Sequence, residues 1–376
     1  MEEKKIKRRQ ENIKDLFILL LQRLWITGAL FGRNKLNNHA AACAYGFLFS
    51  AAPALLLLAF IVSNVLSAAP KLAESLLDQM GHFFGVFEIG ELINNFLSSA
   101  GSGVAGFVSV FTILCAIRFF AISVQRGLGA IFPGHRSMLK KNAVTLGFGF
   151  FIMAIIFIAL VWIRSVINLI GLTGFQSFKI LAPLFANFPR LTLLSSMALL
   201  SIAAYRFIPV KPPKIKNIIF GVLVCLVFYQ IFAAAFSLLI SPERYNLLYG
   251  TLGRLFLFLI NVYIFFVFFL FGAQMIHVLD ISEALLFINF RQVHSNNHQA
   301  KKALKKLFAV LPSPLAKYKA FFNAGDIIHN DGQEVYYILS GKADISENKT
   351  MIKAETDLVV LVLPLQLFSE IERNEI

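Results

Sequence analysis

The sequence that decides the fold is HAAACAYGFLFSAAPALLLLAFIVSNVL, which extends from His39 to Leu66 and has no acidic or basic residue after its histidine. A helix rises about 1.5 Å per residue, so about 20 apolar residues cross a hydrocarbon core of roughly 30 Å. This stretch is therefore predicted to be a membrane helix. Pro53 lies inside it and removes one backbone donor, which predicts a kink in that helix.

The composition of the whole chain agrees with this reading. Of its 376 residues, 57% are apolar and only 15% are charged, which is outside the range of an ordinary soluble domain. The 40 phenylalanines suit packing between helices and against lipid. The 3 cysteines lie in separate apolar runs without paired spacing and are predicted to be reduced and structural.

Six apolar stretches predict six membrane helices, at about residues 40–66, 104–126, 143–164, 191–209, 217–240 and 247–277. Lysine and arginine gather before the first stretch and after the second, fourth and sixth. Basic residues beside a span stay in the cytoplasm, so both termini are expected there, in the cell inner membrane. The net charge of +14 is then explained by the membrane topology and by attraction to anionic lipid headgroups. No nucleic-acid partner is expected.

The flanking segments differ from the six-helix membrane domain, which is assigned to residues 36–280. Residues 1–35 form a basic arm followed by an amphipathic helix. Gln22 and Arg23 interrupt its apolar run and Trp25 prefers headgroup depth, so an interfacial helix is expected rather than a span. Residues 281–314 are expected to be a polar, basic linker.

The last segment, residues 315–376, has the alternation of a soluble β structure. Two of its short motifs resemble the opening strands of a cyclic-nucleotide-binding jelly roll, namely Ala324-Gly325-Asp326 and Tyr337-Ile338-Leu339-Ser340-Gly341. The glutamate and arginine that hold the nucleotide in that family have no counterpart here. We therefore expect a truncated, degenerate jelly roll that does not bind cyclic nucleotide and that packs or docks a protein partner. The predicted fold class is an all-α polytopic membrane protein with this small all-β cytoplasmic domain.

Polar residues at membrane depth are costly and tend to have a use. Arg118, in the second span, either snorkels to the cytoplasmic headgroups or faces a cavity and holds an anionic headgroup or solute. Uncharged groups that could line such a site are Tyr45, Gln125, Tyr249 and Gln274. Glycines that could allow close helix approach are Gly250, Gly253 and Gly272.

No catalytic constellation is present. His294 and His298 have the spacing of a metal site on a helix, but Ser295-Asn296-Asn297 between them indicates a solvated linker. There is no nucleophile elbow, phosphate-binding glycine loop or paired carboxylate in a soluble segment. We expect no enzyme activity, no metal and no cofactor.

Short sequence motifs in the membrane domain resemble those of the YihY or BrkB-like integral membrane proteins, once labelled ribonuclease BN. They are Ala44-Tyr45, Ser50-Ala51-Ala52-Pro53, Tyr249-Gly250-Thr251-Leu252-Gly253 and Gly272-Ala273-Gln274. The resemblance covers roughly residues 12–279 and implies six membrane helices with both ends in the cytoplasm. Members usually have glutamate where this chain has Gln274, so a charged role at that position is not carried over.

Two functions fit these observations. The bundle could be a transporter or flippase-like protein that moves an anionic or lipid-linked substrate past Arg118, with membrane lipids as its partners. Alternatively, it could be a membrane scaffold without transport that docks a protein partner through its cytoplasmic β domain. A polar cavity at membrane depth would favour the first, and a dry bundle filled by leucine and phenylalanine would favour the second.

Overall fold

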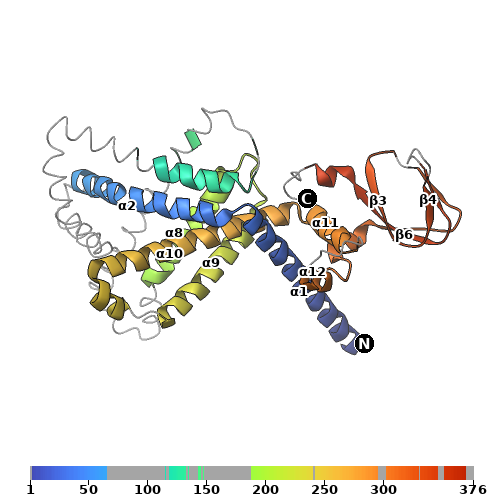
Figure 1. The fold of residues 1–376 in the computed structure, drawn as a ribbon, viewed down its shortest axis with the longest axis horizontal. Helices are drawn as coiled ribbons and strands as arrows, with labels where there is room; N and C mark the ends of the chain where they lie inside the picture. The colour runs from blue at the N-terminus through green and yellow to red at the C-terminus, as the bar shows by residue number, and fades with distance from the viewer. Residues whose placement is uncertain are drawn as a thin grey trace. The chain divides into compact units, whose positions relative to one another are not determined.

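The structure is a computed structural model, and it describes residues 2–65, 115, 118–132, 134, 143–144, 147, 188–239, 242–294, 302–329, 331–345 and 351–369 (Figure 1). The chain forms two compact units. We call residues Phe31–Ile276 the helical unit, and Met1–Leu30 together with His277–Ile376 the mixed unit.

The helical unit is built from long apolar helices. These are α2 (Leu36–Val65), a helical segment at residues 118–129, α8 (Phe188–Phe207), α9 (Ile215–Leu239) and most of α10 (Pro242–Asp280). Helix α2 continues through Pro53. The predicted third span lies outside the described residues, apart from residues 143–144 and 147.

Three described helices are long and apolar enough to cross a membrane, namely Lys14–Arg33, Ile215–Leu238 and Phe256–Asp280. Leu194–Phe207 is a shorter apolar helix. The first of the three, Lys14–Arg33, is the segment that we expected to lie on the membrane surface. Length and composition alone do not distinguish an interfacial helix from a transmembrane helix. The count of six spans stays a prediction.

The core of the helical unit is aromatic and aliphatic. The rings of Phe47, Phe120 and Phe266 contact one another pairwise, with centroids 5.7 Å, 5.8 Å and 6.4 Å apart. Around them, buried side chains come from α2, residues 118–129, α8, α9 and α10. Such offset and edge-to-face pairs stabilise a core without hydrogen bonds.

Helices α9 and α10 cross at two glycines. A Cβ atom built on Gly272 would lie 2.6 Å from the carbonyl oxygen of Gly221, and one built on Gly221 would lie 2.8 Å from the carbonyl oxygen of Gly272. Nearby, Tyr205 of α8 donates a hydrogen bond of 2.6 Å to the carbonyl oxygen of Phe269 and stacks on its ring at 4.9 Å. The three helices can approach this closely because small residues stand at the crossing.

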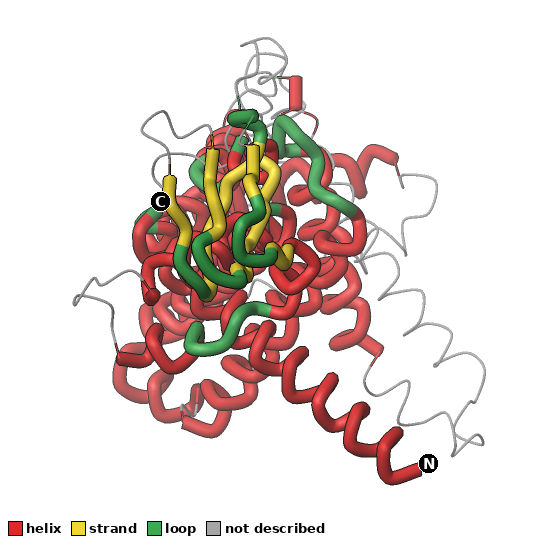
Figure 2. The backbone as a smooth tube through the Cα atoms, turned by 90° about the vertical axis from the view of Figure 1, so that its right-hand side faces the viewer, coloured by secondary structure: helices red, strands yellow, loops and turns green. Residues whose placement is uncertain are grey.

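The mixed unit combines helices with two small sheets, whose strands are yellow in Figure 2. Its helices are α1 (Glu2–Arg33, up to Leu30 in this unit), α11 (Ser282–His294), α12 (Lys302–Leu307) and the 3-10 turns η2 (Ser313–Tyr318) and η3 (Leu365–Phe368). Its strands are β1 (Lys319–Phe322), β2 (Ile327–His329), β3 (Glu334–Ser340), β4 (Ala343–Ile345), β5 (Met351–Ala354) and β6 (Leu358–Pro364).

The two sheets are antiparallel and have three strands each, in the orders β1-β6-β3 and β2-β5-β4. The first strand therefore pairs with the last, and the second with the one before the last. Alternation along β5 and β6 buries Ile352, Ala354, Leu358 and Val360. A small C-terminal β region was predicted from this alternation.

The two short motifs that resemble a jelly roll each contain a glycine that forms a turn. Gly325 and Gly341 have φ values of +99° and +101°, a conformation that glycine adopts without steric cost. The carboxylate of Asp357 accepts a hydrogen bond from the amide of Ala324 at 3.1 Å, and the hydroxyl of Thr356 accepts one from the amide of Lys342 at 2.8 Å. Both turns are thus held by the loop that precedes β6.

The segment 281–314 differs from the expected polar linker. It contains α11 and α12, and α11 buries Leu285, Leu286, Phe287 and Phe290. These side chains pack with residues of α1, η2 and β6 in one apolar cluster. Of the basic residues that predicted a linker, Arg291, Lys305 and Lys306 are exposed, and the apolar residues between them form the buried face.

Candidate functional site

The helix at residues 118–129 has two faces. Phe120, Ser123, Val124 and Gly127 are buried among the described residues, and a Cβ atom on Gly46 of α2 would lie 2.9 Å from the hydroxyl of Ser123. The opposite face carries a row of polar residues, namely Arg118, Gln125 and Arg126.

Arg118 lies on that outer face and is exposed, as is Arg126, while Gln125 is half-buried. Positions 118 and 125 are seven residues apart, which places both side chains on one side of a helix. Arg118 is therefore not turned into the described core.

The other candidate residues do not join this row. The side chain of Tyr45 is 54% exposed on α2. The backbone of Tyr249 lies in α10, but its side chain is outside the described residues, as is that of Pro53. Gly250 also lies in α10, and its burial is not described. Gly253 is buried, and Gly272 lies at the crossing with Gly221.

Gln274 is fully buried in the helical unit. Its Oε1 accepts a hydrogen bond from Nδ2 of Asn34 at 3.5 Å, the outer limit for such a bond, and its Nε2 has no partner among the described residues. Asn34 stands in the turn between α1 and α2, so the pair joins segments 240 residues apart in the sequence. A buried amide donor without a partner is costly.

Other buried polar groups of the helical unit are satisfied locally. The hydroxyls of Ser50, Ser123 and Ser201 donate to carbonyl oxygens of their own helices, at 3.0 Å, 3.0 Å and 2.8 Å. Serine back-bonding of this kind lets a polar residue lie inside an apolar bundle. These serines therefore mark helix packing rather than a binding site.

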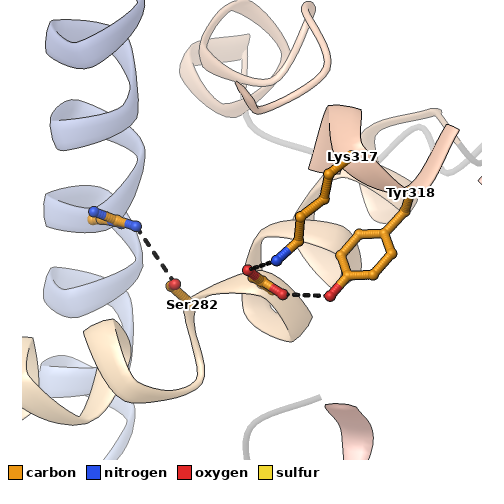
Figure 3. A network of polar contacts seen from close by, with 5 residues as sticks. Ser282, Lys317 and Tyr318 are labelled. Carbon is orange, nitrogen blue, oxygen red and sulfur yellow. Dashed lines mark hydrogen bonds and ion pairs between the residues drawn. The ribbon is translucent and has the colours of Figure 1, made fainter. Parts of the chain in front are cut away.

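A second polar cluster lies in the mixed unit and joins α1, α11 and η2 (Figure 3). The carboxylate of Glu283 contacts Nζ of Lys317 at 2.5 Å and accepts a hydrogen bond from the hydroxyl of Tyr318 at 2.6 Å. Beside it, Nη2 of Arg23 donates to the hydroxyl of Ser282 at 3.5 Å. The hydrogen bond to Glu283 raises the pKa of Lys317. The pKa of Tyr318 is also raised, mainly because the hydroxyl is desolvated by burial and to a smaller extent because it donates a hydrogen bond to Glu283.

Sequence reasoning missed the roles of Asn34, Arg23 and Glu283. The sequence predicts Arg23 only as an interruption of an apolar run. Its spacing from Thr27 and Leu30, both buried, indicates the packed face of α1. No local signal pointed to Asn34 or Glu283, because their partners lie far away in the sequence.

No group of three histidine, cysteine or acidic residues in the described part of the chain could hold a metal ion. His294 packs on Phe290, with ring centroids 4.2 Å apart, and its Nδ1 lies 3.0 Å from the carbonyl oxygen of that residue. His298 lies outside the described residues.

Replacing Glu283 by glutamine tests the second cluster. Since Lys317 is largely exposed, we expect a loss below about 1 kcal/mol in the free energy of unfolding. The pKa of Lys317 is raised, so the contribution is complete below the ordinary lysine pKa and disappears as the pH rises through the raised value. The difference in thermal unfolding temperature from the wild type should thus be constant from about pH 6 to about pH 9 and then shrink. Glu355→Gln, on the exposed loop before β6, should show no such dependence.

Long apolar helices, locally satisfied hydroxyls and an aromatic core define an integral membrane protein. The family model described as Virulence factor BrkB matches residues 29–285, and the chain belongs to this family. The match covers the helical unit and ends inside α11, so the two sheets lie outside it. No curated protein and no solved structure matches the chain.

Proposed function

We propose that the protein is a six-span inner-membrane protein with cytoplasmic termini that moves an anionic or lipid-linked substrate along its lipid-facing surface. The observation that carries the proposal is the outer face of residues 118–129, where Arg118 and Arg126 are exposed and the half-buried Gln125 lies on the same side of the helix as Arg118. An arginine on this face can pair with a phosphate in bidentate geometry.

A path along the surface suits the packing of the described helices better than a central path. Among the described residues, phenylalanines pack in the core of the helical unit, and Gly221 and Gly272 bring α9 and α10 into backbone contact. Headgroups would instead follow the polar face of the helix while the acyl chains stay in the bilayer.

The second candidate function is a membrane scaffold that docks a protein partner through its C-terminal sheets. The aromatic and aliphatic core of the described helices favours this function, because a scaffold needs no polar path. The order of strands supports our reading of a degenerate jelly roll, and we propose that it does not bind cyclic nucleotide. We also propose that the protein is not a nuclease or any other enzyme.

The experiment is leaflet exchange of labelled lipids in proteoliposomes. The wild type should exchange anionic lipids faster than zwitterionic ones. Arg118→Ala should lower the anionic rate about fivefold, since one cationic contact at a membrane surface is worth about 1 kcal/mol. Arg118→Lys should retain part of the rate, because lysine keeps the charge and loses the bidentate geometry.

Phe119→Ala is the matched control, because Phe119 is the next residue and is 54% exposed. It should leave the preference for anionic lipids unchanged. An equal loss of rate in the two alanine variants would contradict a specific role of Arg118. Absence of exchange for every lipid would refute transport of lipids and favour the scaffold.

A further inference from the structure

Helix α1 has one packed face and one open apolar face. On the packed face, Gln22 is 1% exposed, and Ile26 and Leu30 are each 3% exposed. On the open face, Phe17, Leu21 and Trp25 follow one another at intervals of four residues and are 61%, 40% and 37% exposed. Residues at this spacing form one stripe along a helix.

The packed face is held by polar bonds as well as by apolar contacts. Nε2 of Gln22 donates to the carbonyl oxygen of Leu307, the last residue of α12, at 3.0 Å. Arg23 donates to Ser282 at the start of α11. Helix α1 thus belongs to the same unit as the two sheets.

These bonds argue against a transmembrane α1. Gln22 and Arg23 stand near the middle of the apolar segment Lys14–Arg33, so a crossing helix would bring α12 to membrane depth. Helix α12 has only six residues, and it carries the exposed side chains of Lys305 and Lys306. Charged side chains and short helices with open ends are costly in hydrocarbon.

The charge around α1 fits an anionic surface. Six basic residues precede the open stripe on the same helix, namely Lys4, Lys5, Lys7, Arg8, Arg9 and Lys14, against four acidic residues, Glu2, Glu3, Glu11 and Asp15. Lys305 and Lys306 stand directly before Leu307, which binds Gln22. A helix with an apolar stripe and a basic flank binds anionic lipid in the plane of the interface.

We propose that α1 is the membrane anchor of the mixed unit. One face holds α11 and α12, and the open stripe of Phe17, Leu21 and Trp25 inserts into the headgroup region of an anionic bilayer, helped by the basic residues. This would keep the C-terminal sheets at the membrane surface. The inference goes beyond the proposed function and does not depend on transport.

The test uses the fluorescence of Trp25 in the full chain. The chain has two tryptophans, so Trp162→Phe leaves Trp25 as the single reporter. The protein is placed in nanodiscs containing phosphatidylglycerol and lipids that carry a spin label at a shallow or a deep position. We expect quenching by the shallow label to exceed quenching by the deep label about twofold, as for a helix in the interface.

Each alternative position of α1 gives a different result. Stronger quenching by the deep label would indicate a transmembrane α1 and overturn the proposal. Weak quenching by both labels would mean that protein, from this chain or a second copy, covers the stripe, and it would also overturn the proposal.

Charge reversal tests the electrostatic part. The double variant Lys305→Glu and Lys306→Glu should reduce shallow quenching in anionic nanodiscs and leave it unchanged in phosphatidylcholine. The control replaces two exposed lysines of the sheets, Lys342 and Lys353, by glutamate. An equal reduction in both pairs would show that overall charge, and not α12, governs the contact.

Discussion

Replacing Gly272 by valine is expected to destabilise the helical unit more than any other single change proposed for that unit. Its Cβ atom would lie 2.6 Å from the carbonyl oxygen of Gly221, and the backbone of α9 cannot move aside as a flexible side chain can. Overpacking of this kind costs about 1–3 kcal/mol, which lowers the unfolding temperature by about 5 °C.

Cys225 provides the measurement. It is fully buried, and its Cβ atom would lie 3.2 Å from a Cβ atom added to Gly272. Cys115 is exposed and Cys43 is buried elsewhere in the unit, so Cys115→Ser and Cys43→Ala leave one reporter thiol. A thiol-reactive dye should label Cys225 at a lower temperature in the valine variant.

Gly32→Val is the matched control, because nothing lies within 4 Å of a Cβ atom built on Gly32. It should shift the labelling temperature only by the modest helix-propensity difference between glycine and valine. Equal shifts in the two variants would argue that α9 and α10 are not in backbone contact at Gly272.

Replacing Phe308 by alanine is expected to have the largest effect in the mixed unit. Phe308 is fully buried in the apolar cluster that includes Ile26 of α1, Leu285 of α11 and Leu361 of β6. Loss of a buried phenylalanine costs about 3–5 kcal/mol, because a cavity remains. Amide hydrogens of α1 and β6 should then exchange about a hundredfold faster or more.

Hydrogen exchange followed by mass spectrometry on the full chain measures this directly. Peptides from α9 belong to the other unit and should exchange at the wild-type rate, which provides an internal control. Val310→Ala is the matched variant, since Val310 is 69% exposed and should change little. Faster exchange in β6 without any change in α1 would contradict the grouping of α1 with the sheets.

The polar residues show where sequence reasoning ended. Arg118 and Gln274 were both predicted to contribute to one site, yet Arg118 is exposed and Gln274 is fully buried beside Asn34. A polar residue in an apolar stretch indicates a free-energy cost of desolvation, but it does not indicate which way the side chain faces. The residues that pack against it from other helices decide that orientation.

The sequence by itself determined the apolar helices α8 and α9, which lie within three residues of the predicted ranges, and a small β region near the C-terminus. Apolar length and alternation act over a few neighbouring residues, so a local pattern is enough to predict them. Only the tertiary structure decided that α1 joins the sheets through Gln22 and Leu307, which are 285 residues apart, and that α9 and α10 meet at Gly221 and Gly272. The physical reason is that burial depends on distant partners, which no local pattern encodes.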